Sequence, residues 1–583
     1  MVSPSIVPPA PQADLSCFST CGRSLLIDGS PDITVTTFPF RRFSIVSRAV
    51  CFSGETRAFI STVHLQLASV SLHWSQIGGM SKGVPSKSRI GCIAERAKGC
   101  ILIRNIVNKL RSMSIMLAMT NISVLLSSLC LAQATINPFR IVVVDRETQW
   151  PIPMVELRTT HQLRFVSDNA GVIAIDSPEI MNLETMNLET WFSVIGHGYE
   201  VPVDGFGYHG VRLTPTEGGA ARIELTRTAI AKRVGRLTGV GLFAESQKFG
   251  EYLDEPESQV FGCDSVQLAS YRKKLFWAWG DTNIASYPLG IFAMTGATTS
   301  MRPFDSLEPP LRPRFEQFLD AHGRIRGIAE IPGSGPTWLT GYVVLPDEKG
   351  TEHLVASYRK IKPPLDVYEM GLCVWNDSTS SFEKLRTTWV SDSGLPKPSL
   401  AEDGHPVFWT DEAGQRWLFF GNPFPRVRLP ATFEAWQDTA SWKTVLAPAS
   451  LLFSEDDREI TPHSGSIAWN QYRKRWVAVF VQKGGDSSFL GNVWYAEAES
   501  PLGPWGRATE ILSHDNYTFY NPRLYQEFNT NDGSVLLFEG TYTATFANSP
   551  EKTPRYDYNQ ILYRLDLDDP KLILSHSLTN NQR

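Results

Sequence analysis

The feature that most constrains the fold is a repeated pattern in the C-terminal part of the chain. Five segments begin with polar or aromatic residues and then enter an apolar run with strand character. Each is followed by a turn and a second apolar strand, and at least four are followed by a third strand. The five segments are CDSVQLASY (263–271), TWLTGYVVL (337–345), GHPVFWTD (404–411), HSGSIAWN (463–470) and YNPRLYQEF (520–528).

The spacing of these repeats indicates the architecture. From Asp264 to the corresponding residues of the next four segments, the steps are 74, 67, 58 and 58 residues. Repeated β-meanders with no helical period between them are typical of propeller blades. We therefore predict a five-bladed β-propeller over residues 235–575, with a strand from 234–243 closing the last blade.

Residues 139–228 have a different pattern of short β segments separated by turn residues. The segments are FRIVVVD, MVELRTT, LRFVSD, GVIAID, WFSVIG, VRLTP and ARIELTR. Their regular spacing, without a helical stretch, predicts a β-sandwich over residues 135–230. The whole protein is therefore expected to be all-β, with a sandwich followed by a propeller.

The N-terminal region differs from both. Residues 1–112 hold 13 Lys and Arg against 5 Asp and Glu, and residues 113–134 hold no charge. A basic region, a short apolar stretch and an Ala-Gln-Ala end predict a signal peptide cleaved before Thr135, and hence a secreted or periplasmic protein without stable membrane insertion. Residues 1–112 are then an extension from a start codon assigned too early or, alternatively, a basic membrane-tethered segment. Residues 576–583 form a tail.

Charge and cysteine content exclude several functions. After residue 134 the chain carries 42 Lys and Arg against 55 Asp and Glu, which is unsuited to phosphate backbones, so no nucleic acid is expected as a partner. Cys263 and Cys373 are the only cysteines in that part, which provides no disulfide framework and no metal-ligand spacing. We predict no metal and no cofactor, and the oligomeric state stays open.

Propeller geometry selects the candidate site. In a propeller the first strands start, the second strands end and the third strands start at one face of a central channel. First-strand starts supply Asp264, Trp338, His405, His463, Tyr520 and Asn521; second-strand ends supply Asp281, Asn422 and Glu539; third-strand starts supply Glu369, Asp557, Tyr558 and Asn559. Aromatic faces, amides and paired acids are what a sugar-binding and sugar-cleaving site needs.

One of these segments carries a family resemblance. FGCDSVQLASYRKKLFWAWGDTN (261–283) resembles the five-bladed β-propeller glycoside hydrolases, the superfamily of arabinanases, invertases and family 117 anhydro-galactosidases. The resemblance implies that Asp264 is the general base or nucleophile. This chain departs from the superfamily in the second blade, where Thr337 and Trp338 replace the usual Asp, and in the third, where His405 replaces the usual Glu. Family 117 is similar in having a histidine as the proposed acid.

The N-terminal sandwich carries a second resemblance. VVVDRETQWPIPMVELRTT followed by SDNAG is similar to the carboxypeptidase-regulatory-like domains, in which these segments form two strands and a closing hairpin. This implies a domain that contacts carbohydrate or a partner or that acts as a spacer.

We therefore predict a secreted glycoside hydrolase that acts on a poly- or oligosaccharide. The predicted catalytic residues are Asp264 as base or nucleophile and Glu539, His405 or His463 as acid. The predicted substrate-binding residues are Asp281, Trp338, Glu369, Tyr520, Asn521, Arg555, Tyr556 and Asp557. Two alternatives are a non-catalytic carbohydrate-binding propeller, which needs the aromatic residues more than the acids, and a polysaccharide lyase, which needs a His and a Tyr.

Overall fold

The computed structural model describes residues 137–181, 188–256, 258–398, 404–445, 452–528 and 532–572. The predicted extension, signal peptide and tail lie outside these residues. The described chain is all-β, as predicted, and its helices are single turns. They are α2 (Pro178–Met181), α3 (Ala244–Gln247), α4 (Phe433–Gln437), η2 (Ser391–Ser393) and η3 (Thr439–Ser441). No helix in these ranges is long and apolar enough to span a bilayer.

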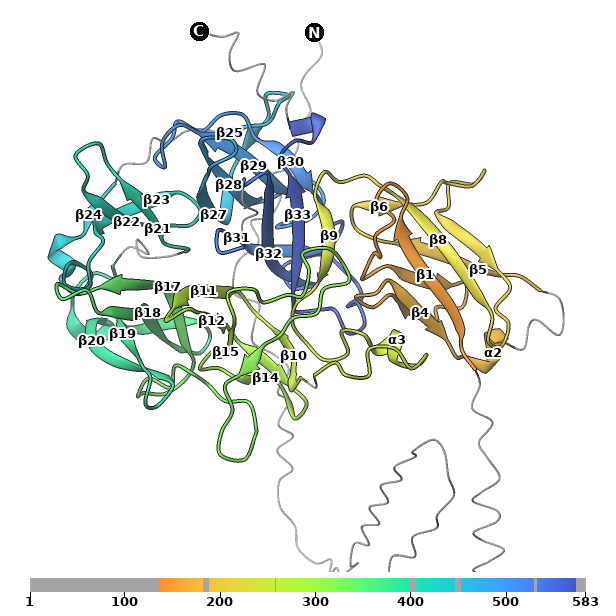
Figure 1. The fold of residues 1–583 in the computed structure, drawn as a ribbon, viewed down its shortest axis with the longest axis horizontal. Helices are drawn as coiled ribbons and strands as arrows, with labels where there is room; N and C mark the ends of the chain where they lie inside the picture. The colour runs from red at the N-terminus through yellow and green to blue at the C-terminus, as the bar shows by residue number, and fades with distance from the viewer. Residues whose placement is uncertain are drawn as a thin grey trace, which may run out of the picture. The chain divides into compact units, whose positions relative to one another are not determined.

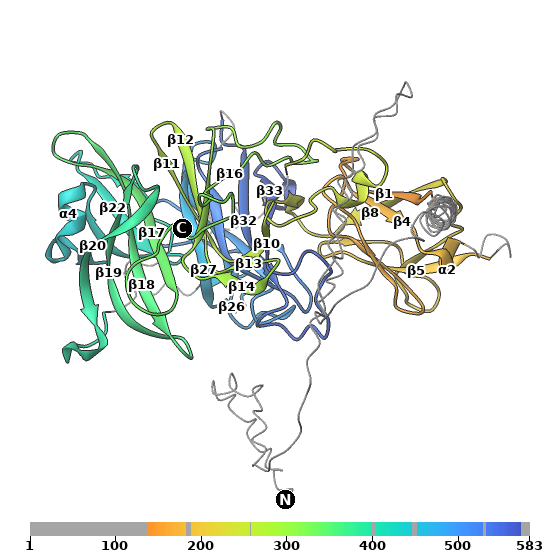
Figure 2. The ribbon, with the colours of Figure 1, turned by 90° about the horizontal axis from the view of Figure 1, so that it is seen from below.

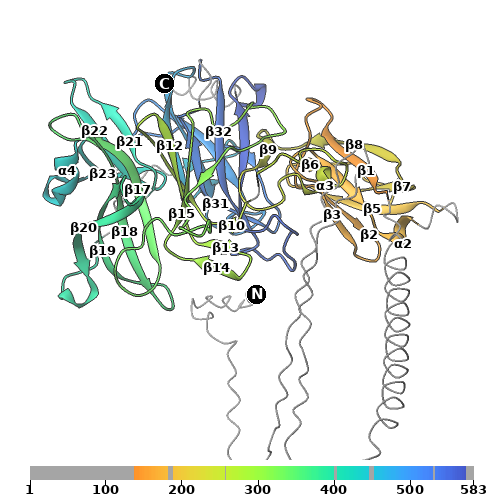
Figure 3. The ribbon, with the colours of Figure 1, turned by 60° about the horizontal axis from the view of Figure 1, so that its bottom comes forward.

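The N-terminal part is a sandwich of two four-stranded sheets (Figure 3). The first has the order β4 (Val172–Ile175), β1 (Phe139–Asp145), β8 (Ala220–Arg227) and β6 (Tyr199–Glu200). The second has the order β3 (Arg164–Val166), β2 (Glu156–Thr159), β5 (Thr190–Ile195) and β7 (Gly210–Leu213). Alternate residues of β1 and β5 enter one shared apolar core with Leu157 and Leu225. This alternation is what makes the strands recognisable in the sequence.

The C-terminal part contains five four-stranded antiparallel sheets among its described residues (Figures 1 and 2). Sheet 1 is β11 (Val266–Tyr271), β12 (Lys274–Trp279), β15 (Thr295–Thr299) and β16 (Glu316–Gln317); sheet 2 is β17 (Thr337–Pro346), β18 (Glu352–Lys362), β19 (Asp366–Asn376) and β20 (Ser381–Val390). Sheet 3 is β21 (Val407–Thr410), β22 (Arg416–Gly421), β23 (Pro425–Pro430) and β24 (Lys443–Thr444). Sheet 4 is β27 (Pro462–Asn470), β28 (Arg475–Gln482), β29 (Val493–Ala498) and β30 (Thr509–Leu512); sheet 5 is β31 (Thr518–Tyr525), β32 (Val535–Thr543), β33 (Asn559–Asp566) and β9 (Lys232–Arg236).

Strand β9 confirms the prediction that the chain entering this part completes its last sheet. It pairs antiparallel with β33, with Ile561 opposite Arg236. The sheet is thus assembled from the two ends of the domain.

Apolar clusters join the sheets into a closed ring. Leu537 and Trp277 share a cluster between sheets 5 and 1. Separate clusters lie between sheets 1 and 2, sheets 2 and 3, sheets 3 and 4, and sheets 4 and 5. Because every sheet buries both of its faces against neighbours, its strands read as nearly continuous apolar runs. This is the arrangement of a β-propeller.

Two details differ from the sequence-based expectation. GIFAMTG (290–296), one of the four segments predicted from the sequence to be third strands, is divided between β14 (Tyr287–Ile291) and β15, with Met294 at φ 53° beside the break. Strand β14 belongs to a separate sheet with β10 (Val260–Cys263) and β13 (Thr282–Ile284). The third strand of sheet 3 was missed because prolines stand at both of its ends. A short pair, β25 (Leu452–Phe453) and β26 (Glu459–Ile460), lies before sheet 4.

Candidate active site

Hydrogen bonds at the starts of the inner strands connect all five sheets in a ring. The Trp338 indole donates to Asp281 across sheets 2 and 1, over 3.1 Å. The Gly404 amide donates to the Thr340 hydroxyl (3.2 Å), the Gly465 amide to the Asn422 side chain (2.8 Å), the Asn521 amide to the Ser464 hydroxyl (3.1 Å), and the Asn521 side chain to the Ser265 hydroxyl. These five bonds fix the inner strands at one level, so they position whatever side chains point into the centre.

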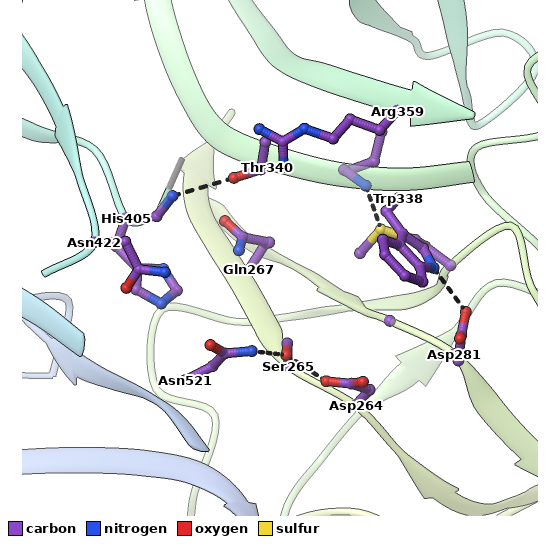
Figure 4. A pocket seen from close by; sticks show the side chains of 14 residues that line it. Asp264, Ser265, Gln267, Asp281, Trp338, Thr340, Arg359, His405, Asn422 and Asn521 are labelled. Atoms are coloured by element: carbon purple, nitrogen blue, oxygen red, sulfur yellow. Dashed lines mark hydrogen bonds between the residues drawn. The ribbon is translucent and has the colours of Figure 1, made fainter. Parts of the chain in front are cut away.

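A cavity of about 260 Å³ lies at this level (Figure 4). Its lining comes from sheets 1, 2, 3 and 5 and from the loops that precede or follow their inner strands. The lining residues are Asp264, Ser265, Gln267, Gly280, Asp281, Met294, Trp338, Leu339, Thr340, Arg359, Gly404, His405, Asn422 and Asn521. Six of the residues selected from propeller geometry therefore meet in one pocket: Asp264, Asp281, Trp338, His405, Asn422 and Asn521.

Asp264 lies between β10 and β11 and is held by neighbouring hydroxyl groups. Tyr558 donates to its Oδ2 over 3.0 Å, and the Ser265 hydroxyl donates to its Oδ1. Burial raises the pKa of Asp264, and the hydroxyls of Ser265 and Tyr520 oppose this by binding the ionised form. The carboxylate is therefore both oriented and supplied with donors for its negative charge.

Asp281 follows β12 and stands beside Asp264, since the Asp264 amide donates to the Asp281 carbonyl over 3.1 Å. Burial and the neighbouring charge of Asp264 together raise the pKa of Asp281 to about 6, and the bond from Trp338 works against this. Asp281 therefore keeps its proton to a higher pH than an ordinary aspartate, and neighbouring carboxyl groups with different pKa values can divide acid and base roles.

Backbone irregularities concentrate at the same level. The register shifts by a bulge in β17 after Thr340, in β27 before Ser464 and in β31 after Tyr520. Asn521 has φ 52° and Ser265 has φ 21°, conformations that non-glycine residues rarely adopt. Bulges re-aim side chains at the ends of strands, and strained residues cluster at functional sites.

The two predicted histidines have different environments. His405 lines the pocket, and burial and the nearby Arg523 cation lower its pKa to about 3. It is therefore neutral in neutral solution, which suits a hydrogen-bonding role and not proton donation. His463 is not among the pocket's lining residues; partial burial of its ring and the Lys483 charge lower its pKa.

Glu539 lies in the middle of β32 and not at its end, because β32 continues to Thr543. Its side chain is fully buried, opposite Arg523 in the register, and Arg523 donates to the Leu268 carbonyl of sheet 1. Burial raises the pKa of Glu539 to about 8, with Tyr525 and Arg523 opposing. The expected raised pKa is present, but Glu539 does not line the cavity described above.

The remaining predicted binding residues are also outside that lining. Tyr520 is buried and lies against Asp264. Glu369 accepts bonds from Tyr358 and Lys384 within sheet 2, both over 2.6 Å. Arg555, Tyr556 and Asp557 fix the loop before β33: Arg555 pairs with Glu245 (2.6 Å), Tyr556 donates to the Ser167 carbonyl of the sandwich, and Asp557 accepts from the Ala544 amide (2.6 Å).

Several residues of the site were not found from the sequence. Ser265, Thr340 and Ser464 lie one or two positions after residues selected as first-strand starts, and they contribute the hydroxyl groups of the ring. A search for hydroxyl residues beside each strand start finds all three. Arg359 and Gln267 are inside strands, and only their register places them on the pocket side.

The described residues hold no group of three or more His, Cys, Asp and Glu side chains suited to a metal ion. The lining of the pocket offers two carboxyl groups, an imidazole, a guanidinium, two hydroxyls, amides and an indole.

Comparisons with known proteins give resemblances to solved structures. No family model and no curated protein matches the sequence. The chain is similar to an exo-1,5-α-L-arabinanase from a bovine ruminal metagenomic library (13% identity, 52% of this chain and 92% of that one, TM-score 0.31). It is similar to the GH43_1 enzyme from Xanthomonas citri complexed with xylotriose (9% identity, 53% of this chain and 87% of that one, TM-score 0.30). It is also similar to an N-acetylgalactosamine deacetylase from F. plautii (10% identity, 59% of this chain and 98% of that one, TM-score 0.32).

Proposed function

We propose that this protein is a glycoside hydrolase that cleaves a poly- or oligosaccharide in the pocket at the centre of the propeller. The observation that carries the proposal is the pair Asp264 and Asp281, two adjacent carboxyl groups that line one cavity and have different partners. Glycosidic bond cleavage needs one carboxylate and one carboxylic acid beside the same bond.

The surroundings of Asp264 and Asp281 support a different role for each group. Tyr558 and Ser265 donate hydrogen bonds to Asp264, so this group releases its proton first and serves as base or nucleophile. Asp281 then keeps its proton up to about pH 6 because of burial and the charge beside it, and in that range it supplies the proton to the leaving oxygen. This replaces Glu539 and the histidines as our preferred acid.

The rest of the pocket fits a sugar. Trp338 offers an aromatic edge, and Asn422, Asn521 and Gln267 offer amide groups for hydroxyls. A cavity of about 260 Å³ is at the small end of ligand pockets. We infer that it admits a chain end and not the middle of a polymer.

The remaining proposals come from the sequence. They are that residues 113–134 direct export, that the propeller has five blades, and that the sandwich is a carboxypeptidase-regulatory-like domain acting as a spacer.

The test is sugar release from a panel of arabinan, β-1,3-galactan and xylan, together with the matching nitrophenyl glycosides. Release that is lost in Asp264→Asn supports the proposal. Binding without release, insensitive to Asp264→Asn and lost in Trp338→Ala, contradicts it and favours a carbohydrate-binding propeller. An unsaturated product with new ultraviolet absorbance contradicts it in favour of a lyase.

A further inference from the structure

A second and larger hollow lies beside the small sheet formed by β10, β13 and β14. Its volume is about 770 Å³, and it runs between this sheet and the segment 320–335. Two phenylalanines of its lining are unusually accessible for apolar residues: Phe261 is 45% exposed and Phe292 is 38% exposed. We call this hollow the side groove.

Two stretches of chain contribute lining residues to both the side groove and the pocket. Phe292 and Ala293 line the groove, and the next residue, Met294, lines the pocket. On the other side, Gly335 lines the groove and Trp338 lines the pocket. The Thr337 amide donates to the Phe292 carbonyl over 3.0 Å, which joins the two stretches. A ligand whose end occupies the pocket therefore has the groove as its neighbouring space.

Three of the four charged side chains of the groove, Asp320, Arg324 and Arg326, are engaged with the protein itself, and the fourth, Glu330, is exposed. Asp320 accepts from the Arg324 side chain over 2.9 Å. Arg326 donates to the carbonyls of Ser380 (2.7 Å) and Gly327 (3.0 Å). Because the positive and negative side chains of the lining also balance, the groove does not favour an ionic ligand.

Accessible aromatic rings in a groove whose charged side chains balance suit one class of ligand. The faces of neutral sugars are apolar C–H surfaces that stack on aromatic rings, whereas their hydroxyl groups bond to backbone and water. Single exposed apolar residues are normal on a protein surface. Two aromatic rings that share one groove beside a polar pocket instead indicate a ligand-binding surface.

We propose that the side groove binds the neutral sugar units of the polysaccharide beyond the unit held in the pocket, with Phe261 and Phe292 as stacking platforms. This rests on the proposed function, since the pocket defines which end of the chain is held. The small pocket selects the terminal unit, and the groove makes the protein prefer long chains over short ones.

The test compares substrates of different lengths. Ladders of arabino-, galacto- and xylo-oligosaccharides from one to six units are compared with a nitrophenyl monoglycoside, for the wild type, Phe261→Ala, Phe292→Ala and the double variant. We expect the ratio of kcat/KM for the hexamer to that for the monoglycoside to fall by roughly 2- to 10-fold for each ring. Phe206→Ala is the matched control, because Phe206 is an 89% exposed ring on the sandwich, and its ratio should equal that of the wild type.

Binding to the Asp264→Asn form, measured by calorimetry, separates this proposal from the hydrolase proposal. Tighter binding of the hexamer than of the dimer, lost in the double variant, supports the groove even if no substrate is cleaved. Equal affinity for dimer and hexamer, or a hexamer preference that survives the double variant, overturns the groove. If monoglycosides are still cleaved in that case, the proposed function stands. Absence of any binding overturns both.

Discussion

Two regions of the propeller hold buried carboxyl groups, and they differ in what surrounds them. Asp264 and Asp281 line a cavity, with each other and with defined donors as neighbours. Glu539 is enclosed between sheets 5 and 1, opposite Arg523. Burial raises the pKa in both regions, to about 6 for Asp281 and about 8 for Glu539. A raised pKa alone therefore does not identify a catalytic acid; access to a ligand must accompany it.

The largest effect that tests this comparison is expected at Asp264. Asp264→Asn keeps the shape of the side chain and removes the charge that a base or nucleophile needs. Loss of a general base typically costs about 10²–10⁴-fold in rate, and loss of a nucleophile costs more. The measurement is kcat on the best substrate of the panel, with urea unfolding as the control for folding. An Asp264→Asn protein with near-normal kcat would move the chemistry away from this pocket.

The second prediction concerns Asp281 as the proton donor. Its pKa of about 6 means that activity should fall as the pH rises above that value, because the acid is then ionised. Asp281→Asn should remove this alkaline limb and lower kcat by roughly 10²-fold on oligosaccharides, while nitrophenyl substrates lose far less, since their leaving group needs no proton. The matched control is Trp338→Phe, which removes the indole donor to Asp281 and keeps an aromatic ring.

Loss of the hydrogen bond from the Trp338 indole to Asp281 should shift the alkaline limb of the pH profile in one direction. The Trp338 bond favours the ionised form of Asp281, so the alkaline limb of Trp338→Phe should shift to higher pH. A limb that stays in place in both variants would assign the titration to another group.

The third prediction is that Glu539, a candidate acid in the sequence analysis, is not needed for catalysis. We expect Glu539→Gln to change kcat little, because the side chain does not line the pocket, but to change how stability depends on pH. In the folded protein burial raises the pKa of Glu539 to about 8, above the ordinary value of 4.5 that applies when the chain is unfolded. Its contribution to stability is therefore complete below about pH 4.5 and is lost progressively as the pH rises to about 8. The loss is on the order of a few kcal/mol.

Urea unfolding at pH 5 and pH 8.5 measures this effect. The difference between the two pH values should be smaller in Glu539→Gln than in the wild type. Arg523 should not be left without a partner, because it also pairs with Glu527 over 2.7 Å. If Glu539→Gln abolishes activity at unchanged stability, then the enclosed carboxyl reaches the substrate after all and the contrast between the two regions fails.

The comparison of the two regions also shows which parts of the fold and of the candidate site could be predicted from the sequence. The repeated apolar strands predicted the meanders and the closing strand β9, because strand alternation and turn residues are local signals. Asp264 was selected as the start of a first strand and Asp281 as the end of a second strand. Glu539 was selected by the same rule and lies in the interior, because the end of β32 depends on its pairing with β31 and not on local residues. The bulges that turn Ser464 and Asn521 toward the ring have no sequence signature of their own.

The smallest expected effect tests whether the ring of hydrogen bonds positions the carboxyl pair. Thr340→Val removes the acceptor of the Gly404 amide without changing the volume of the side chain much. We expect a loss of about 1 kcal/mol in the free energy of unfolding, and a several-fold decrease in kcat because sheets 2 and 3 lose their bond at the level of the pocket. Thr299→Val is the matched control: it removes the hydroxyl that accepts from the Trp277 indole (3.0 Å) within sheet 1, away from the pocket lining. Equal losses of stability with a fall in kcat for Thr340→Val alone would assign the ring a positioning role. Equal effects of both variants on kcat would show that general stability, and not the ring, controls the geometry of Asp264 and Asp281.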